Sequence, residues 1–242
     1  GTLQATLTDF RYLRSIWKKN TEEECLLGVS LTGIMDRELT SSSKNLGETL
    51  KTLQEVAIET NKEWANKLGI NQAASITCVK PSGTVSQLVN SASGIHPRYS
   101  PYYIRTVRAD SKDPMAQYML QAGFPCEVDS TKTIRLPKSE GDRSHLQPTE
   151  QDLYHGTTLV FSFPVKAPTG AVCASDMGAM EQLKLWKIYQ DNWCEHKPSI
   201  TVYYKDEEFL DVCSWMWKNF DMMSGISLLP YSEHVYDQAP YT

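Results

Sequence analysis

Lys80-Pro81-Ser82-Gly83-Thr84-Val85-Ser86 is the segment from which the architecture of this 242-residue chain can be worked out. It follows Ser75–Val79, a short run that is rich in β-forming residues. Pro-Ser-Gly is a turn signal, and the residues after it favour the beginning of a helix near Gln87–Ser91. The segment is therefore predicted to be a turn between a strand and a helix.

A turn of this kind can bind phosphate. Backbone N–H groups at a helix N-terminus attract anions, and the hydroxyls of Ser82, Thr84 and Ser86 add further donors. Gly83 would allow the backbone to approach a ligand closely. The GxxxxGK[ST] spacing of a Walker A loop is missing, however, and a plain turn with a helix cap explains the same residues at least as well.

Strands and helices alternate along the rest of the chain. Helices are predicted at Phe10–Lys19, Ser43–Leu68 with Gly69 closing it, Met115–Ala122 behind an Asp113-Pro114 cap, Met177–Glu195, and from Asp206 to Phe220. Strands are predicted at residues 26–36 (with a turn), 75–79, 102–108, 133–136, 157–165, 199–204 and 225–229, and a surface loop at about 137–156. Because several strands are apolar on both faces, the pattern predicts an α/β fold with parallel strands.

Two helices have apolar residues at the spacing of one buried face. The helix at Met177–Glu195 carries Leu183, Trp186, Tyr189, Gln190 and Trp193. The helix that follows Asp206 carries Phe209, Leu210, Cys213, Trp217 and Phe220. Both sets are predicted to pack into the core.

Composition excludes several classes of protein. The net charge is -5 and the pI is about 5.6, which argues against a nucleic-acid or membrane-surface binder. No apolar run approaches the roughly 20 residues of a membrane span, and Gly1–Asn20 has no apolar region typical of a signal peptide. The six cysteines are scattered without CxxC pairs or zinc-ligand spacing, which predicts a cytoplasmic protein with reduced thiols and no bound metal.

The chain resembles adenosylcobalamin-dependent (class II) ribonucleotide reductases over nearly its whole length, most closely the monomeric branch that uses ribonucleoside triphosphates. The matching segments lie in the same order as in that family. They are Leu27–Asp36, Lys80–Leu88, Asn90–Tyr99, Tyr102–Arg108, Val107–Pro114, Phe161–Val165, Glu181–Leu183, Trp193–His196, Pro198–Tyr203, Ser224–Tyr231 and Gln238–Tyr241.

The resemblance implies a fold and a site. It implies that residues 1–242 form the C-terminal half of a ten-stranded α/β barrel domain. It also implies that the turn after Lys80 binds the substrate phosphates, through Ser82, Gly83, Thr84, Val85 and Ser86. For the adenosylcobalamin cofactor, the candidate contacts are His96, Tyr203 and Tyr204. A loop-stabilising role is the favoured interpretation of His96, and core packing or lining of the cobalamin face is the favoured interpretation of the two tyrosines.

The family reaction implies partners. It converts ribonucleoside triphosphates to 2'-deoxyribonucleotides through a thiyl radical on a cysteine within an Asn-Pro-Cys-x-Glu motif, a string that this sequence does not contain. None of the six cysteines matches the radical cysteine or the reducing pair, so no catalytic residue is assigned to this chain. We therefore expect it to be inactive without an N-terminal half, in the same or a separate polypeptide, and a thioredoxin-type reductant.

Three alternatives remain open at this point. The chain could be a piece of the large subunit of a class I reductase, whose radical comes from a separate metal-containing partner. It could be a noncatalytic nucleotide-binding fragment that kept the barrel, an alternative that the missing catalytic cysteines favour. A purely structural partner is the third alternative, and it leaves the phosphate turn unexplained.

Overall fold

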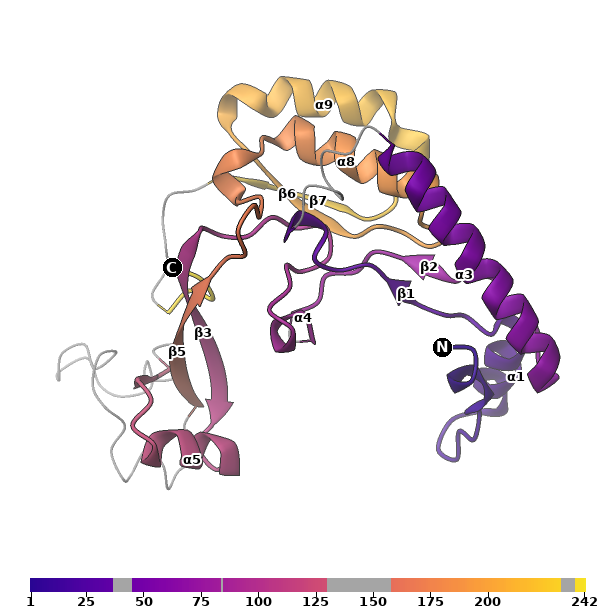
Figure 1. Cartoon of the computed structure of the whole chain (residues 1–242), viewed down its shortest axis with the longest axis horizontal. Coiled ribbons are helices and arrows are strands. Elements are labelled where there is room, and N and C mark those ends of the chain that lie inside the picture. The colour runs from indigo at the N-terminus through magenta and orange to yellow at the C-terminus, as the bar shows by residue number, and fades with distance from the viewer. Residues whose placement is uncertain (37–44, 84, 130–157, 232–237) are drawn as a thin grey trace. The chain divides into compact units, whose positions relative to one another are not determined.

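The computed structural model describes residues 1–36, 45–83, 85–129, 158–231 and 238–242 (Figure 1). Within them the chain divides into two compact units. The first unit comprises Gly1–Arg98 and Pro168–Tyr231, and the second comprises Tyr99–Ala167 and Ser232–Thr242. The strand predicted at residues 133–136 and the loop predicted at 137–156 lie outside the described residues. The assignment of the whole chain to one reductase barrel domain stays a prediction.

The first unit is built around parallel strand pairs. Strand β1 (Val29–Ser30) pairs with β2 (Thr77–Cys78), and β6 (Ile200–Tyr204) pairs with β7 (Ile226–Pro230). A parallel bridge between Val79 and Pro198 connects the two pairs. The unit thus mixes helices with parallel strands, as predicted for an α/β fold.

The helices of this unit differ widely in length. They are α1 (Ser15–Glu24), α3 (Leu46–Leu68), α4 (Val85–Leu88), α8 (Ala179–Asn192) and α9 (Phe209–Lys218). Short 3-10 turns lie at Gln4–Thr6, Ile34–Asp36, Ala174–Asp176, Asp206–Glu208 and Phe220–Met222. No helix in the described ranges has both the length and the apolar character that crossing a membrane requires.

Helix α3 ends where the sequence predicts. Gly69 adopts a left-handed conformation (φ 68°), and its N–H reaches back to the carbonyls of Ala65 and Asn66. The helix packs against α8 and buries Leu46 and Leu50 near its beginning. It also buries Asn61 and Ala65 near its end, so tertiary packing holds both ends of α3 and Gly69 defines where the helix stops.

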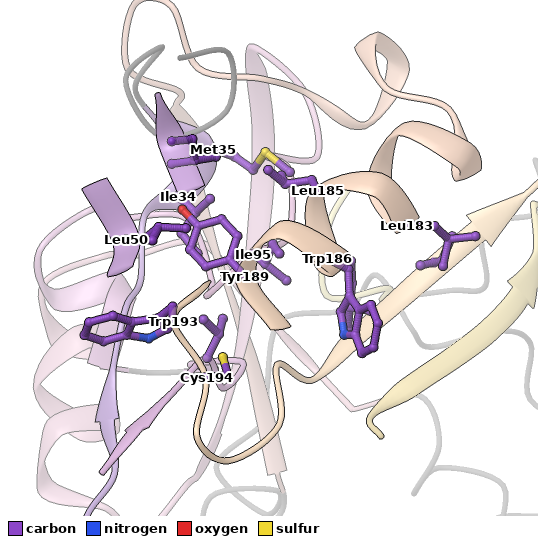
Figure 2. Close-up of a cluster of buried hydrophobic side chains, with 14 of the residues drawn as sticks. Ile34, Met35, Leu50, Ile95, Leu183, Leu185, Trp186, Tyr189, Trp193 and Cys194 are labelled. Carbon is purple, nitrogen blue, oxygen red and sulfur yellow. The ribbon is translucent and has the colours of Figure 1, made fainter. Parts of the chain in front are cut away.

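Helix α8 supplies the centre of the core. Its Leu183, Trp186 and Tyr189 are fully buried, together with Ile95 and Met35 from other segments (Figure 2). The indole Nε1 of Trp186 donates to the Pro198 carbonyl at 2.6 Å, so the polar atom of this large side chain is also satisfied. Burying each such side chain stabilises the fold by about 1.5–3 kcal/mol. The buried face predicted for this helix is confirmed except at Gln190, which is only half-buried.

Helix α9 uses a different face from the one predicted. Its only buried residue is Val212, and Trp215 and Met216 pack beside it against the core. The predicted set is largely exposed instead: Phe209, Leu210, Cys213, Trp217 and Phe220. Apolar residues occur almost all round this helix, so residue spacing alone did not distinguish the two faces.

The N-terminal apolar segment also departs from expectation. The strand predicted within residues 26–36 shortens to β1, whose Val29 is largely exposed. The part that is buried is instead the 3-10 turn at Ile34 and Met35. The two glycines of this segment favour turns over a long extended strand, and Gly33 has a φ of 71°.

The second unit is a small antiparallel sheet with one helix. Strand β5 (Thr158–Lys166) lies between β3 (Tyr102–Asp110) and β4 (Cys126–Val128), and it is antiparallel to both. Helix α5 (Pro114–Gln121) begins as predicted, because the Asp113 carboxylate accepts the N–H of Met115 at 2.8 Å. The positions of β3 and β5 agree with the prediction, whereas β4 was not predicted and the antiparallel pairing differs from the parallel arrangement expected for the whole chain.

Candidate functional site

The turn between β2 and α4 is held by hydrogen bonds within itself. The Ser82 side chain accepts the N–H of Ser86 at 2.9 Å. The Ser86 hydroxyl in turn donates to the Ser82 carbonyl at 2.5 Å, and Ser86 is buried. Ser86 therefore orders the turn from inside, while Ser82 is half-buried at its edge. Thr84 lies outside the described residues.

The outer side of this turn is open. Gly83 and Val85 are exposed, and a Cβ built on Gly83 would meet nothing within 4 Å. The space that a Gly83 side chain would occupy thus holds no protein atoms from the described residues. A backbone that is accessible in this way can approach an anion, which is the property that the sequence predicts for the turn.

A second segment, Asn90–Arg98, packs against the turn and is the supporting segment of the site. The Ser93 hydroxyl accepts the N–H of Ser82 at 2.8 Å. Gly94 (φ 56°) lies so close that a Cβ on it would be 2.8 Å from the Lys80 carbonyl oxygen, and its N–H donates to the Thr32 hydroxyl at 3.0 Å. This segment therefore fixes the beginning of the turn.

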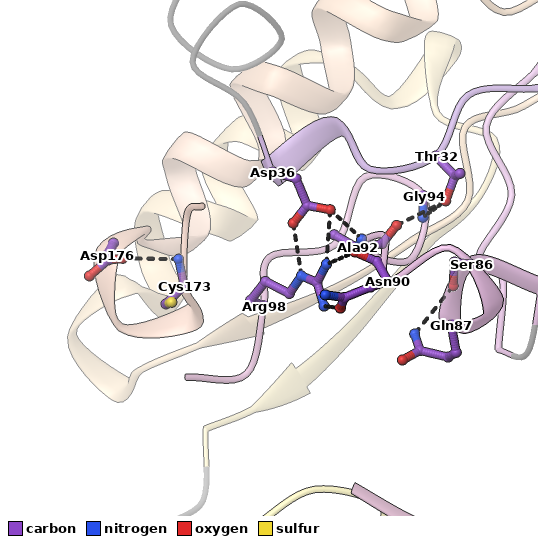
Figure 3. A network of polar contacts seen from close by, with 10 residues as sticks. All are labelled: Thr32, Asp36, Ser86, Gln87, Asn90, Ala92, Gly94, Arg98, Cys173 and Asp176. Atoms are coloured by element: carbon purple, nitrogen blue, oxygen red, sulfur yellow. Dashed lines mark hydrogen bonds and ion pairs between the residues drawn. The ribbon is translucent and has the colours of Figure 1, made fainter. Parts of the chain in front are cut away.

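A buried ion pair anchors the supporting segment (Figure 3). Arg98 donates from Nε and Nη2 to the two carboxylate oxygens of Asp36, at 2.8 and 3.0 Å. The same guanidinium donates to the Asn90 carbonyl at 2.6 Å. Asp36 and Arg98 belong to motifs that mark the resemblance, but no pattern in the sequence predicts that they pair.

His96 connects the supporting segment to β6. Its Nε2 accepts the Thr201 N–H at 3.0 Å, so Nδ1 carries the proton and donates to the Ser93 carbonyl at 3.1 Å. Burial lowers the pKa of His96, and the bond to Ser93 opposes this shift in part. Because both ring nitrogens are bonded to the backbone, neutral His96 holds the supporting segment against β6. A contact with the cofactor stays a prediction.

Tyr203 and Tyr204 lie at the end of β6 and point to opposite faces of the strand, as neighbours in a strand do. Tyr203 is half exposed. Tyr204 is half-buried and packs its ring against that of Phe209, with centroids 5.8 Å apart. The role of both as cofactor contacts stays a prediction, and core packing of Tyr204 agrees with the alternative drawn from the sequence.

The cysteines are poorly placed for chemistry. All but Cys213 are buried. Burial raises the pKa of Cys194 to about 12 and also raises that of Cys78, so both thiols stay protonated at neutral pH. Among the residues that the structure describes, no group of three or more His, Cys, Asp or Glu side chains could hold a metal ion.

Comparisons with known proteins point to one family. No family model matches the chain. The adenosylcobalamin-dependent ribonucleoside-triphosphate reductase of Levilactobacillus brevis is 25 % identical over 97 % of this chain and 32 % of its own length. The enzyme of the same name from Lactobacillus delbrueckii subsp. bulgaricus is 26 % identical over 96 % of this chain and 32 % of its own length.

The fold agrees with this relationship. A crystal structure of a B12-dependent (class II) ribonucleotide reductase superposes with a TM-score of 0.71, at 22 % identity, over 93 % of this chain and 32 % of that one. The chain spans about a third of the length of the curated relatives it matches. It is therefore a homologue, over nearly all of its residues, of about one third of an adenosylcobalamin-dependent ribonucleotide reductase.

Proposed function

We propose that this chain supplies the substrate phosphate-binding turn of an adenosylcobalamin-dependent ribonucleoside-triphosphate reductase. The observation that carries the proposal is the space beside the exposed Gly83, where a Cβ would meet no described atom within 4 Å, on a turn fixed by Ser82 and Ser86. Neutral N–H groups held in place in this way can bind phosphate oxygens without a lysine. The names of the relatives support a nucleoside triphosphate as the ligand.

The contacts of the turn indicate a different role for each of the predicted phosphate-binding residues. Gly83 and Val85 would present backbone N–H groups on the exposed side, and Ser82 would add its hydroxyl hydrogen. Ser86 would act from inside the turn, because its hydroxyl donates to the Ser82 carbonyl. Thr84 remains a proposed ligand from the sequence alone, since it lies outside the described residues.

The strands of the first unit would form part of the barrel wall. The parallel pairs β1–β2 and β6–β7 and the bridge at Val79 support this role. The phosphate turn follows β2 directly, so it lies at the carboxyl end of a parallel strand, where α/β folds place their ligands.

Adenosylcobalamin would supply the radical that begins the reaction. Of the proposed contacts, Tyr203 fits best, because its half-exposed ring offers a flat apolar surface. His96 does not fit as a cobalt ligand, because both of its nitrogens are bonded to the backbone. Its proposed contribution is to hold the Ser93 loop against β6.

Catalysis would need residues beyond this chain. The buried, protonated thiols of Cys78 and Cys194 are unsuited to exchanging disulfides, because the thiolate is the attacking form. The sequence also lacks the Asn-Pro-Cys-x-Glu string that carries the radical cysteine in the family it resembles. We propose that an N-terminal half, in the same or a separate polypeptide, carries the radical cysteine, and that a thioredoxin-type dithiol in the cytoplasm supplies electrons.

Reconstitution tests this proposal. The intact protein, with the N-terminal half present, is incubated with a ribonucleoside triphosphate and a dithiol, with and without adenosylcobalamin. Formation of the 2'-deoxyribonucleotide only when the cofactor is present is the expected result. Tight triphosphate binding without any cofactor-dependent reduction would instead favour the noncatalytic nucleotide-binding alternative, and the absence of triphosphate binding would refute both.

A further inference from the structure

We propose that Asp36 and Arg98 are positioning residues that hold the turn at Ser82–Ser86 in its phosphate-binding conformation without touching the phosphate. The inference rests on the proposed function and extends it to residues outside the turn. It begins from the burial of both charges: the Arg98 side chain is 2 % exposed and that of Asp36 is 12 % exposed.

The ion pair has a well-defined geometry. Arg98 donates to both carboxylate oxygens of Asp36, at 2.8 and 3.0 Å, in the planar two-bond arrangement that only arginine can form. Two charges withdrawn from water add little net stability even when they are paired. A pair of this kind is therefore better explained by the arrangement it enforces than by the stability it adds.

The pair holds the supporting segment at two positions. Asp36 Oδ2 accepts the Ala92 N–H at 2.6 Å. Arg98 donates to the Asn90 carbonyl at 2.6 Å and to the Asn90 side-chain oxygen at 3.2 Å (Figure 3). Asn90 has a φ of 47°, a left-handed conformation that asparagine adopts more readily than most residues other than glycine.

The supporting segment in turn holds both ends of the phosphate turn. Next to Asn90, the N–H of Ser91 donates to the Ser86 carbonyl at 2.8 Å. Next to Ala92, the Ser93 hydroxyl accepts the Ser82 N–H at 2.8 Å. The Asp36–Arg98 pair thus holds Asn90 and Ala92 directly. The residues that follow them, Ser91 and Ser93, are bonded to the last and first residues of the turn.

Arg98 is placed to position the turn and not to bind phosphate. Its charge is compensated by Asp36, and its side chain is almost completely buried. If Arg98 were a phosphate ligand, removing the Asp36 charge would free a cation and strengthen binding. If it is a positioning residue, the same change loosens the turn and weakens binding. The two roles therefore predict opposite effects of one substitution.

The experiment measures the dissociation constants of a ribonucleoside triphosphate and of the phosphate-free ribonucleoside with the same base, on the intact protein by calorimetry. We expect Asp36→Asn and Arg98→Lys each to weaken triphosphate binding about tenfold, equivalent to about 1.4 kcal/mol. Nucleoside binding should stay unchanged, because the turn contacts only the phosphates. A general structural defect would weaken both ligands.

Two further variants keep the test decisive if the buried substitutions unfold the protein. Ser93→Ala removes only the acceptor of the Ser82 N–H, and it should reproduce the selective loss of triphosphate binding. Asp9→Asn, which breaks the exposed ion pair with Arg11, is the control and should change neither constant.

The outcomes separate the two proposals. Triphosphate binding that is unchanged in Ser93→Ala, or unchanged or tighter in Asp36→Asn, overturns the positioning role while the proposed function stands. Wild-type protein that does not bind the triphosphate overturns the proposed function and, with it, this inference.

Discussion

Gly94 lies against the Lys80 carbonyl so closely that a Cβ built on Gly94 would be 2.8 Å from that oxygen. The two residues belong to the supporting segment and to the beginning of the phosphate turn. Gly94 also has a φ of 56°, which L-amino acids with a side chain rarely adopt. Close approach and left-handed backbone together mean that a side chain is poorly tolerated at Gly94.

Gly94→Ala should therefore destabilise the protein. The left-handed backbone and the contact with Lys80 are each expected to contribute, for a total of about 1–3 kcal/mol in the free energy of unfolding. Denaturant unfolding measures the change. Gly123→Ala is a matched control that isolates the backbone contribution, because Gly123 has a φ of 76° but a Cβ added there would meet no described atom within 4 Å. Equal losses in both variants would show that the close contact contributes nothing.

Gly83→Val should leave the stability of the protein almost unchanged and weaken triphosphate binding. A side chain at Gly83 meets no described atom within 4 Å, so the free energy of unfolding should change by less than about 1 kcal/mol. The new methyl groups would occupy the space proposed for phosphate, and triphosphate binding should weaken at least about tenfold. Comparing calorimetric titrations with unfolding curves measures both effects. Normal triphosphate affinity in a folded variant would remove the turn from the site.

His96 should make stability depend on pH. Its pKa is lowered in the folded state, so the unfolded chain binds the proton more readily. The stability that neutral His96 confers is complete above the unfolded value of about 6.5 and is lost as the pH falls below it. Melting temperatures measured between pH 5 and 8 should fall more steeply on the acid side in wild type than in His96→Asn. Melting temperatures that change with pH in the same way in both proteins would show that neutral His96 does not hold the supporting segment against β6.

The cysteines should differ sharply in reactivity. Cys213 is exposed, whereas the other five are buried, and burial raises the pKa of Cys126 and Cys173 as well. An aromatic disulfide reagent at pH 8 should therefore label one thiol quickly in the native protein, and Cys213→Ser should abolish that phase. All six should react in denaturant. A second fast thiol in native protein would reveal a cysteine available for redox chemistry.

Local signals were sufficient for some elements. Gly69 and Asp113 define helix ends through bonds within a few residues, and the structure confirms both. The buried face of α8 could also be predicted, because Trp186 and Tyr189 recur on one side of a helix that is polar on the other.

Long-range features could not be predicted in the same way. Asp36 and Arg98 are 62 positions apart, and neither has a local pattern that would pair them. Which face of α9 is buried depends on the segments that pack against Val212. The antiparallel pairing of β3 and β5 depends on the direction in which the chain runs when it comes back to β3, about 50 residues later in the sequence. The phosphate turn was found through family resemblance, since its hydroxyl residues suit an ordinary helix cap equally well.

Amide hydrogen exchange on the intact protein, with and without a ribonucleoside triphosphate, reports directly whether phosphate binds at the turn. We expect the triphosphate to slow exchange at the backbone amides of Gly83 and Val85, and the phosphate-free ribonucleoside to leave it unchanged. Triphosphate binding that leaves these amides unchanged, or that protects only other segments of the chain, would show that phosphate does not bind at the turn.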